Sequence, residues 1–105
     1  MLLINIYKKI LSSEPNCSYV LIQCGLSLQE EGRVADAIQQ YTLAIKIDPD
    51  FGYAYYARGW AKHFLGDYQG ELEDAKIGLG LDSQNLGIYL RRIGAAYSGM
   101  KKYPE

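Results

Sequence analysis

An internal period of 34 residues is the feature that most limits how this chain of 105 residues can fold. Gly25 and Gly59 are 34 residues apart, and Gly94 follows Gly59 after 35 residues. Three further pairs of identical residues stand 34 apart: Gly32 and Gly66, Pro15 and Pro49, Tyr7 and Tyr41. A period of roughly 20–50 residues is typical of solenoids, in which each unit buries its apolar face on the next. The period therefore predicts a stack of similar units.

Within each unit the apolar residues recur with the spacing of an α-helix. One such stripe contains Val34, Ile38 and Tyr41 and ends before Pro49, which cannot continue a helix. Tight turns between helices are predicted at Gly32 and Gly66, and Asp67 is expected to cap the helix that follows it. The pattern predicts about six helices, near residues 3–13, 18–31, 35–47, 52–65, 69–81 and 86–99.

The arrangement of large, small and aromatic residues in these units resembles the tetratricopeptide repeat family. The first full unit, residues 18–51, carries Leu21, Cys24, Gly25, Leu28, Ala37, Tyr41, Ala44 and Pro49. The second, residues 52–85, keeps Tyr55, Gly59, Gly66, Asp67, Tyr68 and Gly78 but departs from the family pattern at Arg58, Lys62, Glu71 and Ser83. Residues 86–105 begin a third unit, and residues 1–16 match only the second helix of a preceding one.

The resemblance covers the whole chain. It implies an all-α fold, an antiparallel helix-pair solenoid wound into a right-handed superhelix, with residues 1–105 forming a single domain. Gly25, Gly59 and Gly94 fall in mid-helix, where glycine costs roughly 0.5–1 kcal/mol relative to alanine. We expect these glycines where two helices approach closely.

Composition excludes several classes of protein. With 11 basic and 12 acidic residues the formal charge is −1, which is not the charge of a dedicated nucleic-acid binder. No apolar run approaches the roughly 18 residues that span a membrane, and the N-terminus lacks the order of a signal peptide. Two cysteines, Cys17 and Cys24, are too few for a disulfide-rich secreted fold. We expect a cytoplasmic protein, with Cys24 as a small buried hydrophobic residue.

Few residues suit catalysis. His63 is the only histidine, so neither a histidine-based metal cluster nor a catalytic triad with a spare histidine can form, and we expect it to be an exposed polar residue. Glu71, Glu73 and Asp74 lie in the first turns of a predicted helix, where carboxylates favour the positive end of the helix dipole. We expect them to be solvated. No enzymatic activity, metal, cofactor or small-molecule substrate is expected.

The resemblance implies that the first helix of each pair lines the concave side of the solenoid. In the second unit, Tyr53, Tyr56, Trp60 and Phe64 follow one another at spacings of 3, 4 and 4 and form one aromatic stripe. A helix needs only one apolar stripe to join the core, so a second stripe points to a binding partner. The predicted groove is lined by Tyr19, Ile22, Leu26, Tyr53, Tyr56, Trp60, Phe64, Ile88, Arg91 and Arg92.

Tyrosine, tryptophan and arginine are enriched in binding hot spots, and a peptide with apolar anchors and an acidic residue would suit this groove. The alternative is that the aromatic side chains pack on the helices of neighbouring units. Many members of the family bind chaperone tails through Lys, Asn and Arg side chains. At those positions this chain has Ile22, Leu26, Ala57 and Ile88, and only Arg92 agrees. We therefore do not expect chaperone-tail binding.

Two functions are consistent with these patterns. The first is an adaptor that binds a peptide or a partner protein in the aromatic groove. The second is a scaffold that forms homo-oligomers through the groove or through uncapped ends. Apolar residues expected at those ends are Leu2, Leu3, Ile6, Ile10, Ile93, Ala96, Tyr97 and Tyr103. The chain is then either a piece of a longer solenoid or pairs with another copy.

Overall fold

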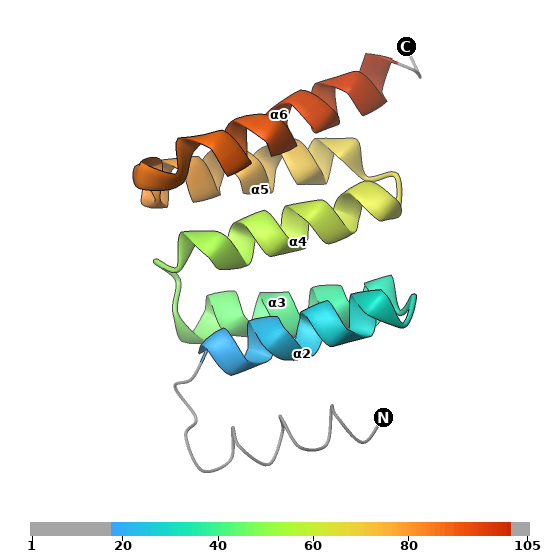
Figure 1. Cartoon of the computed structure of the whole chain (residues 1–105), viewed down its shortest axis with the longest axis vertical. Coiled ribbons are helices and arrows are strands. Elements are labelled where there is room, and N and C mark those ends of the chain that lie inside the picture. The colour runs from blue at the N-terminus through green and yellow to red at the C-terminus, as the bar shows by residue number, and fades with distance from the viewer. Residues whose placement is uncertain (1–17, 102–105) are drawn as a thin grey trace.

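A computed structural model describes residues 18–101, which form five α-helices and one 3₁₀ turn with no strand among them (Figure 1). The elements are α2 (Ser18–Glu30), α3 (Val34–Ile47), α4 (Gly52–Phe64), α5 (Tyr68–Leu81), η1 (Ser83–Asn85) and α6 (Leu86–Lys101). The predicted all-α fold is confirmed, and the five predicted helices in this range agree to within one or two residues at each end. The helix predicted near residues 3–13 and the partial unit at residues 1–16 lie outside the described residues.

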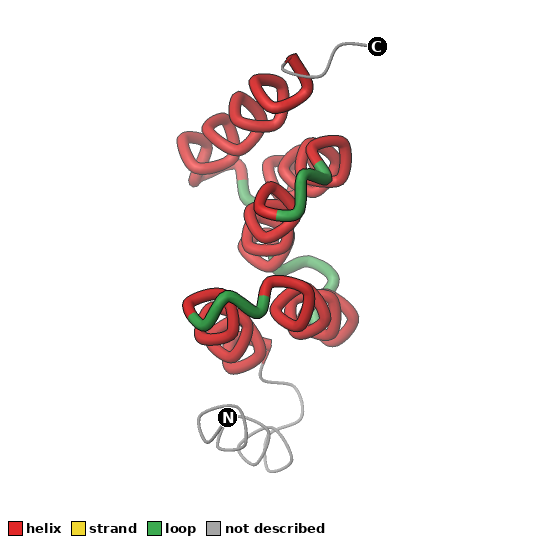
Figure 2. Tube along the Cα trace, turned by 90° about the vertical axis from the view of Figure 1, so that its right-hand side faces the viewer, coloured by secondary structure: helices red, strands yellow, loops and turns green. Residues whose placement is uncertain are grey.

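The helices form an elongated stack. Each one packs on the next in the chain, and α4 also contacts α2 and α6 (Figure 1). Seen after a turn of 90°, the helices lie nearly end-on in two staggered columns (Figure 2). Contacts are thus made between neighbours along the stack, as in a solenoid. None of the helices within residues 18–101 is long and apolar enough to cross a membrane.

Glycine makes both turns between paired helices. Gly32 and Gly66 have φ angles of 82° and 79°, in the left-handed region that other residues rarely adopt. After the second turn, the Asp67 carboxylate accepts a hydrogen bond of 2.9 Å from the backbone N–H of Gly70. This bond satisfies one of the free N–H groups at the start of α5. Both predicted turns and the predicted cap are confirmed.

A tyrosine ring sets the distance between α2 and α3. Tyr41 of α3 is fully buried and lies on Gly25 of α2, where an added Cβ would be 2.8 Å from its Cδ1 atom and closer still to Cε1. The Tyr41 hydroxyl donates to the side-chain oxygen of Gln29, and burial raises the pKa of this hydroxyl. Gly59 likewise faces the Cβ of Asp74, 3.3 Å from where its own Cβ would be. The predicted close approach is wrong for Gly94, which has no described atom within 4 Å.

The core lies between α2, α3 and α4. Three alanines on one side of α4, at spacings of 3 and 4, let this helix lie close to the first pair. The buried cluster consists of Leu21, Ile22, Cys24, Leu28, Ala37, Tyr41, Ala44, Ala54, Ala57 and Ala61. Cys24 is fully buried, as predicted.

Substituting Gly25 and Gly94 by alanine should have opposite effects on stability. In Gly25→Ala the new methyl group collides with the Tyr41 ring, and we expect a loss of about 1–3 kcal/mol in the free energy of unfolding. In Gly94→Ala the methyl group meets open space, and the better helix propensity should add about 0.5–1 kcal/mol. Urea unfolding followed by circular dichroism measures both. Equal effects of the two substitutions would contradict the role given to the Tyr41 ring.

Candidate functional site

The four aromatic residues of α4 form two ring pairs along one face of the helix. Tyr53 and Tyr56 stack with ring centroids 5.4 Å apart, and Trp60 and Phe64 meet edge to face at 5.6 Å. Phe64 is 57% exposed, whereas the other three are partly buried. The two pairs have different surroundings.

The first pair packs within the solenoid. Tyr53 lies against the core cluster, and burial raises the pKa of its hydroxyl. Tyr56 meets the ring of Tyr89 on α6 edge to face, with centroids 6.0 Å apart. Tyr89 itself is fully buried and donates a hydrogen bond of 2.9 Å to Asp82. Tyr53 and Tyr56 therefore join α4 to the units on either side.

The second pair lines a hollow between the end of α4 and the turn that joins α2 to α3. Its volume is about 400 Å³, within the range of binding pockets for small groups. We call it the Trp60 pocket, and its lining consists of Leu26, Gln29, Glu30, Gly32, Val34, Trp60 and Phe64. The apolar side chains come from three helices, while Gln29 and Glu30 supply polar groups. An exposed apolar side chain of a partner would find both kinds of contact here.

The other residues of the predicted groove are spread over different environments. Tyr19 is 59% exposed on α2, Ile88 is partly buried on α6, and Arg91 is exposed. Ile22, expected to face the groove, is fully buried in the core because α2 packs on α3 and α4 at once. Of the ten residues predicted, Leu26, Trp60 and Phe64 meet at one pocket.

Two carboxylates expected to be solvated are buried instead. Asp74 is 2% exposed and accepts two hydrogen bonds from Arg58, at 2.9 and 2.8 Å. These bonds raise the pKa of the guanidinium. The Nζ atom of Lys62 lies 3.1 Å from the same carboxylate. Asp74 thus holds two cations of α4 against α5.

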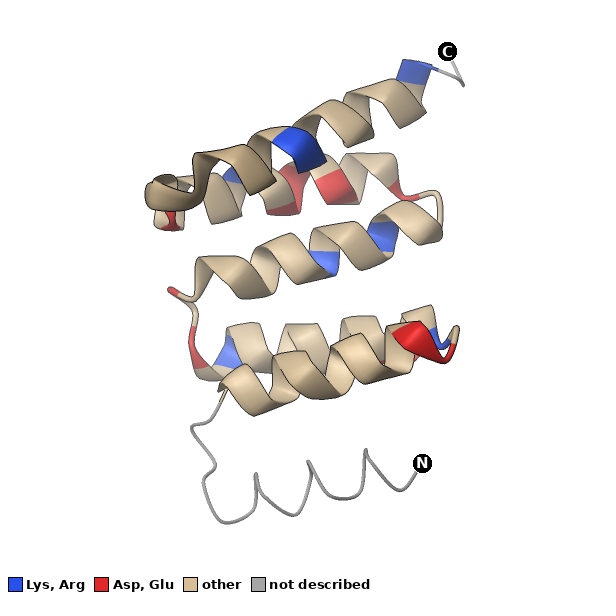
Figure 3. Ribbon diagram, viewed as in Figure 1, with Lys and Arg blue, Asp and Glu red and all other residues tan. Residues whose placement is uncertain are grey.

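Glu71, one turn earlier on α5, joins three helices. It is fully buried, and its two oxygens contact Nδ1 of His63 on α4 and Nη1 of Arg92 on α6, each at 2.9 Å. Acidic segments of α5 accordingly lie between basic segments of α4 and α6 (Figure 3). His63 was expected to be exposed. That prediction is wrong, because the ring lies between Glu71 and the rings of Tyr68 and Phe64. Arg92 was expected at the edge of the groove and is ion-paired instead.

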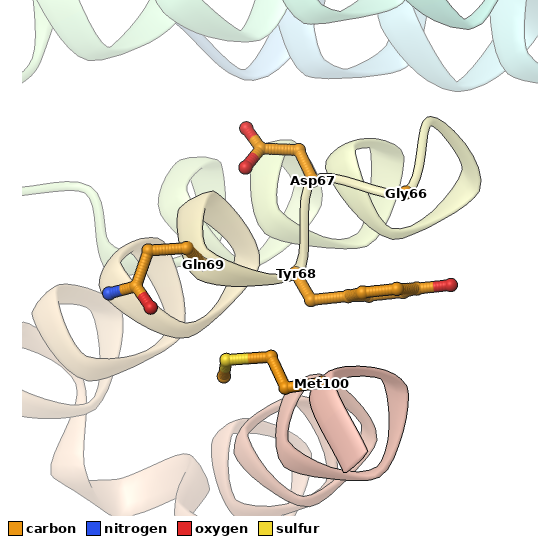
Figure 4. Close-up of a pocket in the computed structure, with 5 residues that line it drawn as sticks. All are labelled: Gly66, Asp67, Tyr68, Gln69 and Met100. Carbon is orange, nitrogen blue, oxygen red and sulfur yellow. The ribbon is translucent and has the colours of Figure 1, made fainter. Parts of the chain in front are cut away.

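A second hollow, of about 490 Å³, lies one unit further along the stack (Figure 4). It is lined by Gly66, Asp67, Tyr68, Gln69 and Met100. Ala95 and Gly99 stand 35 residues after Trp60 and Phe64, so this hollow has no matching aromatic pair. The Tyr68 ring fills that space by lying on Gly99, where an added Cβ would be 2.6 Å from its Cε1 atom.

No group of three or more His, Cys, Asp or Glu side chains within residues 18–101 is arranged to hold a metal ion.

Removing the Glu71 carboxylate should destabilise the fold strongly. In Glu71→Ala, Arg92 and His63 lose their shared partner in a buried position, and we expect a loss of about 2–4 kcal/mol in the free energy of unfolding. Glu73→Ala, an exposed carboxylate on the same helix, is the matched control and should change stability by less than about 0.5 kcal/mol. Thermal unfolding followed by circular dichroism compares them. Similar effects of both substitutions would refute the bridging role.

Comparison with known proteins supports the repeat assignment. Residues 25–66 match the family model described as TPR repeat. Among solved structures, the MamA protein superposes with a TM-score of 0.77 at 26% sequence identity, over 92% of this chain and 52% of that one. This chain thus spans about half the length of the MamA chain.

The TPR2B domain of yeast Sti1, solved in a complex with pHsp70, superposes with a TM-score of 0.79 at 22% identity. The match covers 96% of this chain and 82% of that one. No curated protein sequence matches the chain. The family model, the glycine turns and the stacked helix pairs agree: residues 25–66 match the TPR repeat, and the chain has the fold of a tetratricopeptide repeat solenoid.

Proposed function

We propose that the chain is a protein-interaction module, an adaptor that binds a segment of a partner protein at the Trp60 pocket. The observation that carries this proposal is the pair of Trp60 and Phe64 at an open apolar hollow, on a helix that already buries its alanines elsewhere. The Sti1 domain, which shares the fold and is solved in a complex with pHsp70, supports the same class of function.

The proposed partner inserts a large apolar side chain into the pocket. Leu26, Val34 and Trp60 would contact that side chain, while Gln29 can hydrogen-bond the backbone next to it. Tryptophan at the centre of such a contact is typical of a hot spot, because its large ring excludes water from a wide area.

Trp60→Ala should abolish capture of the partner from a native lysate. Loss of a hot spot worth roughly 2 kcal/mol lowers affinity about 30-fold. Leu43→Ala is the matched control, because Leu43 is 42% exposed on α3 and takes no part in the pocket. Both variants should keep the circular dichroism of the unmodified chain. A partner that binds Trp60→Ala at full affinity would disprove the proposed site.

Self-association is a second candidate function, and one observation favours it. Leu86, Leu90 and Tyr97 are each about half exposed on α6 (49%, 50% and 51%). Their spacings of 4 and 7 place them on one side of the helix. Such a stripe is typical of a surface that pairs with another apolar face.

If α6 mediates self-association, the measured mass should rise with concentration and Leu90→Glu should keep the chain monomeric. A glutamate in the middle of the stripe would have to lose its water on pairing, which is costly for an unpaired charge. Sedimentation velocity compares this variant with Leu43→Glu, which places the same charge on α3. A chain that stays monomeric at high micromolar concentration would exclude this function.

A further inference from the structure

We infer that the Trp60 pocket selects a basic partner segment, in which a large apolar side chain is flanked by lysine or arginine. This inference rests on the proposed function and adds the charge of the partner. It follows from the charges around the pocket.

The uncompensated charges at the pocket are negative. Glu30 lines it, and Glu31 follows directly in the exposed turn between α2 and α3. Within the described part of the chain neither carboxylate forms an ion pair. Arg33, the nearest cation in this turn, lies 2.6 Å from a carboxylate oxygen of Asp36, so that pair adds no net charge. Two adjacent carboxylates that form no ion pair thus lie beside the apolar lining of the pocket.

The cations of α4 face away from the pocket. Arg58 and Lys62 each stand two residues from Trp60, a rotation of roughly 200° about the helix axis, and both bind Asp74 on α5. His63 binds Glu71. The basic residues near Trp60 in sequence are therefore directed into the α4–α5 contact, and they do not offset Glu30 and Glu31.

Helix ends add to the negative potential. The last residues of α2 and α4, Glu30 and Phe64, both line the pocket. The C-terminal end of a helix carries a partial negative charge on its free carbonyl groups, which favours a cation there. Val34, the first residue of α3, also lines the pocket and brings the partial positive charge of a helix N-terminus. Two of the three helix ends thus act in the same direction as the carboxylates.

The charge of the expected partner is therefore the reverse of the sequence-based expectation. That expectation is a peptide with an acidic residue, in a groove lined in part by Arg91 and Arg92. Arg92 is bound to Glu71 with 12% of its side chain exposed, and neither arginine lines the pocket. A lysine or arginine beside the apolar anchor would instead meet Glu30 and Glu31 at the rim, where such pairs retain partial solvation.

Three matched pools of short synthetic peptides test the inference. Each pool carries the same central pair of apolar residues drawn from Leu, Ile, Met and Phe, flanked by Lys, by Gln or by Glu. Trp60 is the only tryptophan of the chain, so its fluorescence reports binding at the pocket. The lysine pool should bind roughly three- to tenfold more tightly than the glutamine pool, the gain typical of one or two surface ion pairs, and the glutamate pool more weakly.

Removing the two carboxylates should remove the preference. In Glu30→Gln/Glu31→Gln the three pools should bind within about twofold of one another, and high salt should have a similar effect on the unmodified chain. Glu73→Gln, which neutralises an exposed carboxylate on α5, should keep the order of the pools.

Equal affinities for the three pools, or tightest binding of the glutamate pool, would overturn the charge inference and leave the apolar site intact. No change in Trp60 fluorescence with any pool would overturn the charge inference and the proposed function together. The same holds if the only occupant found is a second copy of the chain.

Discussion

The packing of this solenoid depends on tyrosine rings that lie against helical glycines of a neighbouring helix. Tyr41 on Gly25 joins α2 to α3, while Tyr89 on Gly78 and Tyr68 on Gly99 join α5 to α6. A flat ring against a bare backbone allows helix axes to approach while still burying a large apolar area. Because a single added methyl group would collide with each ring, these contacts determine how neighbouring helices pair and how far apart they lie.

The contact between α4 and α5 is made by charged side chains, whereas the α2–α3 and α5–α6 contacts are made by tyrosine rings. Gly59 faces Asp74 and the Glu71 backbone in place of a ring. Asp74 is held by two cations of α4, and the Glu71 carboxylate contacts His63 of the same helix. A buried ion pair adds little net stability, because each charge gives up its hydration. It does impose one alignment of the helices, since a shift of α4 by one turn would separate Asp74 from Arg58 and Lys62, and Glu71 from His63. The aromatic side of α4 is thereby turned toward the Trp60 pocket.

Local features of the fold could be predicted from the sequence, while the burial of charged side chains against partners on other helices could not. The helices, the turns at Gly32 and Gly66 and the Asp67 cap depend on residues close in the chain, which is why spacing alone predicts them. The burial of Glu71 depends on partners 8 and 21 residues away on two other helices. The sequence does contain one indication of this burial. Charged residues replace the residues usual in the family at three positions, Arg58, Lys62 and Glu71. Because these charges have opposite signs, they are expected to pair with one another. The burial of Ile22 had no comparable signal, because it depends on how α2 tilts between two neighbours.

The bridge made by Glu71 has a consequence for how such a chain can change over generations. His63, Glu71 and Arg92 belong to three helices and two repeats, and neither Glu71 nor Arg92 can be replaced alone without leaving an unmatched charge inside the stack. Duplication or exchange of a single repeat would separate the carboxylate from Arg92. The bridge therefore makes the second and third units depend on each other, although in outline each resembles an interchangeable module.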